Sequence, residues 1–238
     1  MPDNPIKGLL FDKDGTLFDF SASWSAVVSH TIRELARSDA EADAMATDVG
    51  FDRRNNLFLP GSIIVAGAVR ESAEIWASYR PDLGVTFIED LANRVADQAV
   101  AEGALVPAVP DFKPFLCGLK ESGYVLGIAT HDSESAARTQ VARYNALECF
   151  AFIAGYDSGY GLKPGPGMML AFCKATALVP SECAMIGDSI HDLGVAGASG
   201  AALAIGVLTG PAGHDDISDH ADHVLGSIAE LPALLETV

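Results

Sequence analysis

Short apolar runs alternate with helically spaced apolar positions along most of the chain. The first run, residues 6–11, ends in the polar turn DKDGT, which is typical of a buried strand followed by a loop. Further strand candidates lie at residues 125–129, 152–154, 184–186, 202–205 and 223–225. Helical stretches separate these runs, and this alternation predicts a Rossmann-like α/β fold with a doubly wound parallel sheet.

The stretch between the first two apolar runs has a different pattern. Trp24, Val28 and Ile32 recur at helical spacing, and so do Phe87 and Leu91 in a later segment. We therefore expect residues 18–103 to form an inserted all-helical domain, with a proline-containing linker at residues 105–110 leading out of it. The expected core domain is discontinuous and consists of residues 1–17 and 104–238.

Composition narrows the class of protein. With 238 residues, 49% of them hydrophobic, the chain is long enough for a substantial core and a smaller insertion. No apolar run approaches the length of a membrane span, and the first residues lack the order of a signal peptide, so we expect a cytoplasmic protein. The four cysteines form no C-x-x-C pair and are expected to be reduced, buried thiols.

The formal net charge of −17 limits the partners. A chain this acidic would repel a nucleic-acid backbone or an anionic membrane, so neither is expected as a partner. A phosphorylated substrate would be repelled as well. A site for such a substrate therefore needs a divalent cation and a few local basic groups.

Polar residues that follow the strand candidates are the first to inspect, because ligands of open α/β sheets bind at the carboxyl ends of the strands. Asp12 follows the first run, and Asp14 and Gly15 complete a D-x-D-G turn. One acid of such a pair can attack a substrate while its neighbour transfers protons. Taken alone, the same turn is equally typical of a solvated loop after a strand.

The other strand ends carry similar groups. Asp188 and Asp192 lie four residues apart across a strand-to-helix junction, where their oxygens suit Mg²⁺ or, as an alternative, the cap of the helix. Lys163 precedes a helix that a proline can start, and Thr130 directly follows a strand. Each of these two residues is, by itself, more typical of a solvated or capping side chain.

The four motifs together, in this order and each at a strand end, resemble the haloacid dehalogenase superfamily. The resemblance rests on DKDGT at residues 12–16, Thr130, KPGP at residues 163–166 and GDSIHD at residues 187–192, and so spans nearly the whole chain. The inserted helical segment resembles the cap domain of the phosphoglycolate phosphatase-like branch. His131 departs from the family, which often has asparagine after the hydroxyl residue.

The resemblance implies a Mg²⁺-dependent phosphatase that forms an aspartyl-phosphate. Asp12 would be the nucleophile and Asp14 the general acid and base. The metal would be held by Asp12, the backbone carbonyl of Asp14, Asp188 and, through water, Asp192. Thr130, Lys163 and the backbone N–H of His131 would bind the phosphoryl oxygens. Because Asp14 and Asp188 are present, the resemblance favours phosphate esters over carbon–halogen or phosphonate substrates.

The substrate is less well specified. A small phosphorylated metabolite is expected, with phosphoglycolate as the family-level hypothesis, and cap residues would select it. Arg53 and Arg54 form the only adjacent basic pair of the insertion and could bind a carboxylate, although a solvated surface pair is the more common arrangement. The acidic, histidine-containing stretch 214–223 matches no specific metal motif and is expected to be a solvated loop.

Two alternatives in other classes remain open at this point. A phosphosugar mutase would use the same aspartyl-phosphate chemistry, and a non-catalytic phosphate-binding module would keep the fold without turnover. The sequence does not distinguish a monomer from a homodimer.

Overall fold

A computed structural model describes residues 6–59, 61–66 and 69–238 of the chain. The chain forms two units, which we describe separately. The core unit contains Met1–Asp19 and Pro107–Val238, and the helical unit contains Phe20–Val106. The pattern of the sequence predicts the two boundaries between the units at residues 17/18 and 103/104.

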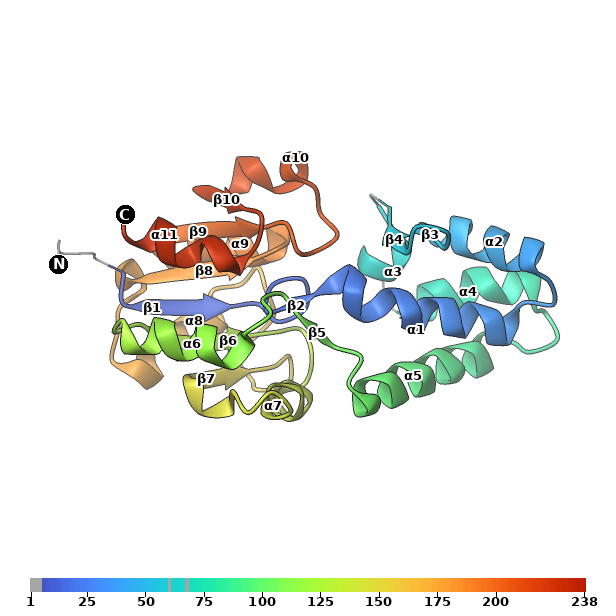
Figure 1. Cartoon of the computed structure of the whole chain (residues 1–238), viewed down its shortest axis with the longest axis horizontal. Helices are drawn as coiled ribbons and strands as arrows, with labels where there is room; N and C mark the ends of the chain where they lie inside the picture. The colour runs from blue at the N-terminus through green and yellow to red at the C-terminus, as the bar shows by residue number, and fades with distance from the viewer. Residues whose placement is uncertain (1–5, 60, 67–68) are drawn as a thin grey trace. The chain divides into compact units, whose positions relative to one another are not determined.

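Parallel strands form the central sheet of the core unit (Figure 1). Within the described residues this sheet has six strands in the order β10-β9-β8-β1-β6-β7. Their bounds are β1 (Gly8–Phe11), β6 (Val125–Ala129), β7 (Phe150–Ala154), β8 (Cys183–Gly187), β9 (Leu203–Val207) and β10 (His223–Leu225). The predicted Rossmann-like α/β fold with a doubly wound parallel sheet is confirmed.

Helices lie on both faces of this sheet (Figure 1). They are α6 (Phe112–Glu121), α7 (Glu134–Ala142), α8 (Gly167–Thr176), α9 (Ile190–Ser199), α10 (His214–Ile217) and α11 (Leu231–Leu235), with short 3₁₀ turns η1 (Leu147–Cys149), η2 (Pro180–Glu182), η3 (Ser218–His220) and η4 (Ile228–Glu230). One apolar core joins strands to α8 and α9, through Leu10, Met185, Phe172 and Leu193. Burial of these side chains holds the strands in place.

The register of the three central strands sets the position of the loops that follow them. Phe11 at the end of β1 pairs with Ile128 of β6 and Ile186 of β8. Because the strands are parallel and level, the loops after β1, β6 and β8 leave the sheet at the same edge. Asp12, Thr130 and Asp188 lie at this edge, each directly after its strand.

The helical unit consists of α1 (Phe20–Leu35), α2 (Asp39–Asp48), α3 (Ile63–Ala66), α4 (Val69–Tyr79) and α5 (Val85–Glu102). It also contains a two-stranded hairpin, β3 (Phe51–Asp52) with β4 (Leu57–Phe58). Its core includes Ile32, Met45, Trp76 and Ile88. Helix α5 differs from the predicted face, because Ile88 is buried while Phe87 is 47% exposed. Leu91 packs against this core as predicted, so Phe87 alone was assigned to the wrong face and Ile88 takes its place.

Where the chain passes between the two units, β2 (Phe18–Asp19) and β5 (Val106–Pro107) form a second two-stranded sheet. Two further bonds hold these segments: the N–H of Ala108 donates to the carbonyl of Leu17, and the N–H of Val106 donates to Oγ of Ser23. No helix in the described part of the chain is long and apolar enough to cross a membrane.

Candidate active site

Asp12 is the first residue after β1, and its side chain is buried. Strand β1 lies between β6 and β8 in the sheet. The N–H of Asp12 continues the pairing with β8 by donating to the carbonyl of Ile186 at 2.8 Å. The sheet therefore fixes the backbone of the predicted nucleophile from both sides.

The turn after Asp12 depends on Gly15. Its φ of 83° lies in the left-handed region that glycine tolerates. A Cβ at this position would lie 2.4 Å from Oδ2 of Asp188, which is closer than any side chain allows. The N–H groups of Leu17 and Phe18 both donate to the carbonyl of Lys13, which closes the turn. The first-motif loop therefore contacts the loop after β8 directly.

Lys163 links Asp12 to Asp192. Its Nζ lies 2.5 Å from Oδ1 of each carboxylate, and all three side chains are buried. Burial alone would lower the pKa of Lys163, but the charges of Asp12 and Asp192 outweigh it and raise this pKa. The ammonium group therefore stays charged inside the site.

Asp12, Asp188 and Asp192 form a cluster of buried carboxylates, with one oxygen of each lying within 4.8 Å of the others. Burial raises the pKa of Asp12 to about 7, with Asp192 adding to the effect and Lys163 opposing it. Burial likewise raises the pKa of Asp188, and the charges of Asp12 and Asp192 add to it. Three carboxylates face a single ammonium group, so the ionised cluster carries an excess of negative charge that is costly without further compensation.

This cluster fits a hard divalent cation. Carboxylate oxygens are the ligands that Mg²⁺ prefers, and the excess of acids over lysine is the charge that a cation would neutralise. The side chain of Asp14 is not part of the cluster, since its Oδ2 binds Nζ of Lys13 at 2.5 Å. The metal contact expected of Asp14 therefore remains a prediction for its backbone carbonyl.

Neighbouring polar groups orient the acids of the cluster. Oγ1 of Thr16 lies 3.4 Å from Oδ1 of Asp188. Oδ2 of Asp192 accepts from the N–H of Ser189 at 3.1 Å and from its Oγ at 2.6 Å, as part of the capping box of α9. One oxygen of Asp192 thus caps the helix while the other contacts Lys163, and binding of Mg²⁺ by Asp192 stays a prediction.

Thr130 and His131 follow β6 at the same edge of the sheet. Thr130 is buried, and its Oγ1 accepts the N–H of Asp132 at 3.1 Å, which leaves the hydroxyl hydrogen available for donation. The His131 side chain contacts the loop of Lys163, because its Nε2 accepts the N–H of Lys163 at 3.2 Å. Burial and the charge of Lys163 lower the pKa of His131, which favours the neutral ring that this bond requires.

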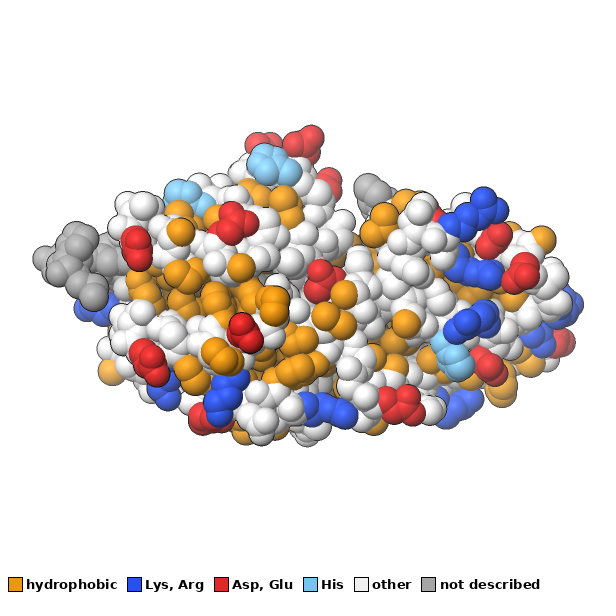
Figure 2. Space-filling model, in the orientation of Figure 1, with side chains coloured by type: hydrophobic (Ala, Val, Ile, Leu, Met, Phe, Trp, Pro, Cys, Tyr) orange, Lys and Arg blue, Asp and Glu red, His pale blue; other side chains and the backbone are white. Residues whose placement is uncertain are grey.

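Arg53 and Arg54 lie in the turn between β3 and β4 of the helical unit. Arg53 forms ion pairs with Asp39 at 3.1 Å and Asp43 at 3.3 Å, and the largely exposed Arg54 lies 3.7 Å from Asp43. Figure 2 shows basic side chains interspersed with acidic ones on the surface of this unit, and in this unit all of the basic ones are arginines. The described contacts of these arginines are ion pairs within the helical unit, and a role in substrate binding stays a prediction.

Sequence reasoning missed several residues of the site. Lys13 is fully buried beside Asp14, and a Cβ at Gly210 would lie 1.9 Å from Oδ2 of Asp188. The position of Lys13 between two acids gave no sign of its burial, because a lysine in such a turn is usually solvated. Gly210 carried no signal either, because its loop meets Asp188 only after the sheet has formed.

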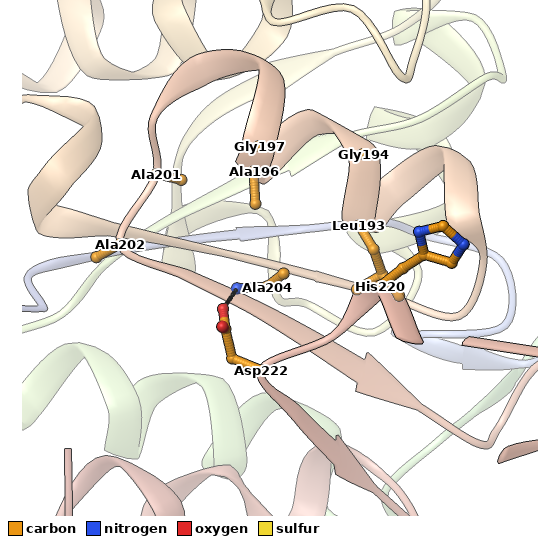
Figure 3. A pocket seen from close by; sticks show the side chains of 9 residues that line it. All are labelled: Leu193, Gly194, Ala196, Gly197, Ala201, Ala202, Ala204, His220 and Asp222. Carbon is orange, nitrogen blue, oxygen red and sulfur yellow. Dashed lines mark hydrogen bonds between the residues drawn. The ribbon is translucent and has the colours of Figure 1, made fainter. Parts of the chain in front are cut away.

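A pocket of about 400 Å³ lies elsewhere in the core unit (Figure 3). Small and apolar residues of α9 and β9 line most of it, with His220 and Asp222 as its polar groups. The carboxylate of Asp222 is engaged, since its Oδ2 accepts the N–H of Ala204 at 2.8 Å (Figure 3). The described part of stretch 214–223 forms no metal-type cluster, and the pocket contains none of the predicted catalytic side chains.

Known proteins resemble this chain in sequence and in fold. The family model for haloacid dehalogenase-like hydrolases matches residues 6–200. The chain is similar to the phosphoglycolate phosphatases of Salmonella choleraesuis (24% identity) and Escherichia coli K12 (23%), in each case over 82% of this chain and 79% of the relative. Its fold resembles that of a family hydrolase from Deinococcus radiodurans, solved with bound phosphate and sodium, with a TM-score of 0.73, 20% identity and coverage of 98% and 96% of the two chains. The chain belongs to the haloacid dehalogenase-like hydrolase family.

Proposed function

We propose that this enzyme is a Mg²⁺-dependent phosphatase that hydrolyses a small phosphate monoester through an aspartyl-phosphate on Asp12. The observation that supports this most directly is the pairing of buried Asp12 with Lys163 beside two further carboxylates. That arrangement combines a carboxylate nucleophile, a fixed positive charge and a set of oxygen ligands at one edge of the sheet. The phosphatase relatives support the same reaction class.

In the proposed first step, a carboxylate oxygen of Asp12 attacks phosphorus while the bond from phosphorus to the leaving oxygen breaks. Asp14 donates its proton to that leaving oxygen, which departs as an alcohol. In the second step, water attacks the phosphorus of the aspartyl-phosphate and passes a proton to Asp14. The bond between phosphorus and Asp12 then breaks, inorganic phosphate forms, and both acids return to their starting states.

Lys163 has two functions in this mechanism. Its contact with Oδ1 of Asp12 orients the carboxylate and favours its ionised form. Its charge also stabilises the negative charge that spreads over the phosphoryl oxygens in the transition state. The hydroxyl of Thr130 and the backbone N–H of His131 are proposed as further donors to those oxygens.

Asp12, Asp188 and the backbone carbonyl of Asp14 would hold the metal ion, with Asp192 acting through a water molecule. Bound Mg²⁺ would supply the positive charge that lets the clustered acids and an anionic phosphate occupy one site. The raised pKa of Asp12 fits this need, since without added positive charge the nucleophile is partly protonated near neutral pH.

For the substrate, we propose a small phosphorylated metabolite of the phosphoglycolate type. The relatives are phosphoglycolate phosphatases, which favours a small phosphorylated acid. The acidic character of the chain disfavours a nucleic acid or an anionic membrane as a partner. We expect the enzyme to act in the cytoplasm. The helical unit is the proposed cap that contacts the leaving group. Arg53 and Arg54 remain its candidate carboxylate-binding residues.

A panel of phosphate monoesters tests the proposal. Purified protein with Mg²⁺ should release inorganic phosphate from at least one small ester, whereas excess chelator or Asp12→Asn should stop the release. Full turnover in chelator would contradict the metal requirement. Interconversion of hexose phosphates without phosphate release would favour a mutase, and binding without any turnover would favour a non-catalytic module.

A further inference from the structure

Lys13 is a fully buried lysine with two acidic partners. Its side chain has 0% exposure, and its Nζ lies 2.5 Å from Oδ2 of Asp14 and 3.0 Å from Oδ2 of Asp132. Both carboxylates lie within ion-pair distance of its ammonium group. A lysine within the first motif is thus fully buried, although charged side chains are rarely fully buried in proteins.

This lysine connects two loops of the site. Its backbone carbonyl closes the turn after β1, and its Nζ lies 5.9 Å from the centre of the Phe18 ring. Its partner Asp132 belongs to the loop after β6, and the N–H of Asp132 donates to Oγ1 of Thr130. The ammonium group is therefore held from several sides and can act as a fixed point for a neighbouring carboxylate.

The two oxygens of Asp14 have different surroundings. Oδ2 is bound by Lys13, whereas Oδ1 is buried and has no hydrogen-bond partner among the described residues. A buried polar atom without a partner is uncommon and costly. One end of this carboxyl group is thus anchored, and the other is left for a group that the protein does not itself provide.

We propose that Lys13 is a positioning residue that holds Oδ2 of Asp14, so that Oδ1 is the oxygen that exchanges the proton with the leaving group and with water. The inference rests on the proposed function, because the proton transfer by Asp14 belongs to it. Lys13 does not touch the reacting atoms in this scheme. It acts through Asp14 alone, so its contribution should disappear when Asp14 can no longer transfer a proton.

A purely structural role explains the arrangement less well. Well-packed apolar residues in place of a whole buried ion pair are often neutral or stabilising, so stability alone is a weak reason to place a charge at this position. The chain nevertheless places a cation against the second acid of the first motif and shares it with Asp132. A positioning role for this cation has a kinetic signature that packing lacks.

The test compares kcat/KM for phosphoglycolate, an alkyl ester, with that for p-nitrophenyl phosphate, an aryl ester with a good leaving group. Lys13→Met should lower the alkyl value by about tenfold or more and the aryl value by less than about threefold, because only the alkyl ester needs its leaving oxygen protonated. Lys7→Met is the matched control, since exposed Lys7 also pairs with a carboxylate at 2.5 Å, that of Glu182. It should leave both values unchanged.

A double-mutant cycle with Asp14→Asn completes the test. On the Asp14→Asn background, Lys13→Met should change the alkyl value by less than about twofold, because the two residues act as one unit. Lys13→Gln keeps a donor in the same volume, so it should fold even if Lys13→Met does not and should give an intermediate alkyl-to-aryl ratio.

Equal losses on both esters, or full additivity with Asp14→Asn, would overturn the positioning role. Failure of both Lys13 variants to fold, checked by circular dichroism, would also overturn it and assign the ammonium group to the fold. The outcome remains separable from the proposed function. If wild type hydrolyses no ester, the phosphatase proposal fails; if Asp14→Asn shows the leaving-group effect and Lys13→Met does not, only this inference fails.

Discussion

Gly210 lies so close to Asp188 that a Cβ at position 210 would be 1.9 Å from Oδ2 of that carboxylate. The backbone of the loop after β9 therefore contacts the acid directly. Gly15 also lies against Asp188, since a Cβ there would be 2.4 Å from the same oxygen. One side chain of the proposed metal site is thus positioned by two glycines from distant parts of the chain.

Gly210→Ala should displace Asp188 and weaken the metal site. We expect the Mg²⁺ concentration for half-maximal activity to rise by about tenfold, a size typical of changes to groups that orient metal ligands. Titration of activity with Mg²⁺ measures this. Gly118→Ala is the control, because a Cβ there meets nothing within 4 Å and alanine favours helix α6. An unchanged Mg²⁺ requirement in Gly210→Ala would contradict the proposed role of Asp188.

The buried acids should make the metal-free enzyme less stable as pH rises. The pKa of Asp12 is raised from 3.8 to about 7, and that of Asp188 is raised as well. Between pH 3.8 and about pH 7, the two pKa values of Asp12, the folded state binds more protons than the unfolded state. The free energy of unfolding therefore falls as pH increases through this window. Denaturant unfolding in chelator at pH 5, 6, 7 and 8 measures the trend.

Asp188→Asn isolates this effect from other titrating groups. Its neutral amide should make the chelated protein more stable than wild type at pH 8, and the difference should shrink towards pH 5. Added Mg²⁺ should stabilise wild type more at pH 8 than at pH 5 and should do less for the variant. A difference between the two proteins that does not change with pH would rule out this account.

Replacing the first or the second acid of the first motif should affect different steps of the reaction. Asp12→Asn should abolish turnover of every ester, because an amide is a poor nucleophile and a weaker metal ligand. Asp14→Asn should spare the attack on aryl esters relative to alkyl esters and slow the breakdown of the phosphoenzyme. Mass spectrometry after acid quench should then find phosphate on Asp12. Phosphate on another residue would refute the assignment.

Arg53→Ala and Arg54→Ala test substrate selection by the helical unit. If either arginine binds a substrate carboxylate, its loss should raise KM for phosphoglycolate by about tenfold, with little change for p-nitrophenyl phosphate. Arg70→Ala is a suitable control, because Arg70 is also an exposed, ion-paired arginine of this unit. Equal effects on both substrates would mean that these arginines form ordinary surface ion pairs and do not select the substrate.

The positions of Asp12, Thr130 and Asp188 could be predicted because each directly follows a buried apolar run. Once those runs are known to be parallel neighbours, the groups that follow them must meet at one edge. Burial of Val28 and Ile32 in α1 followed from helical spacing in the same way. These predictions needed only the period of the apolar pattern.

Contacts between loops could not be predicted in this way. The ion pair of Lys13 with Asp132 joins residues that are distant in sequence, and a lysine between two acids is typical of a solvated turn. The approach of Gly210 to Asp188 depends on the paths of two loops rather than on side-chain type. In α5, apolar spacing alone could not decide whether Phe87 or Ile88 is the buried residue, since both fit nearly the same helical periodicity.

The order of strands in the sheet also constrains how the enzyme forms during synthesis. β1 is made early, yet its partners β6 and β8 follow only after the helical unit has been made. The helical unit is one continuous segment, so its internal contacts can form on the ribosome while β1 still lacks a neighbour. The strand that carries Asp12 is enclosed late, and a nascent chain that stops before β8 has a nucleophile but no complete site around it.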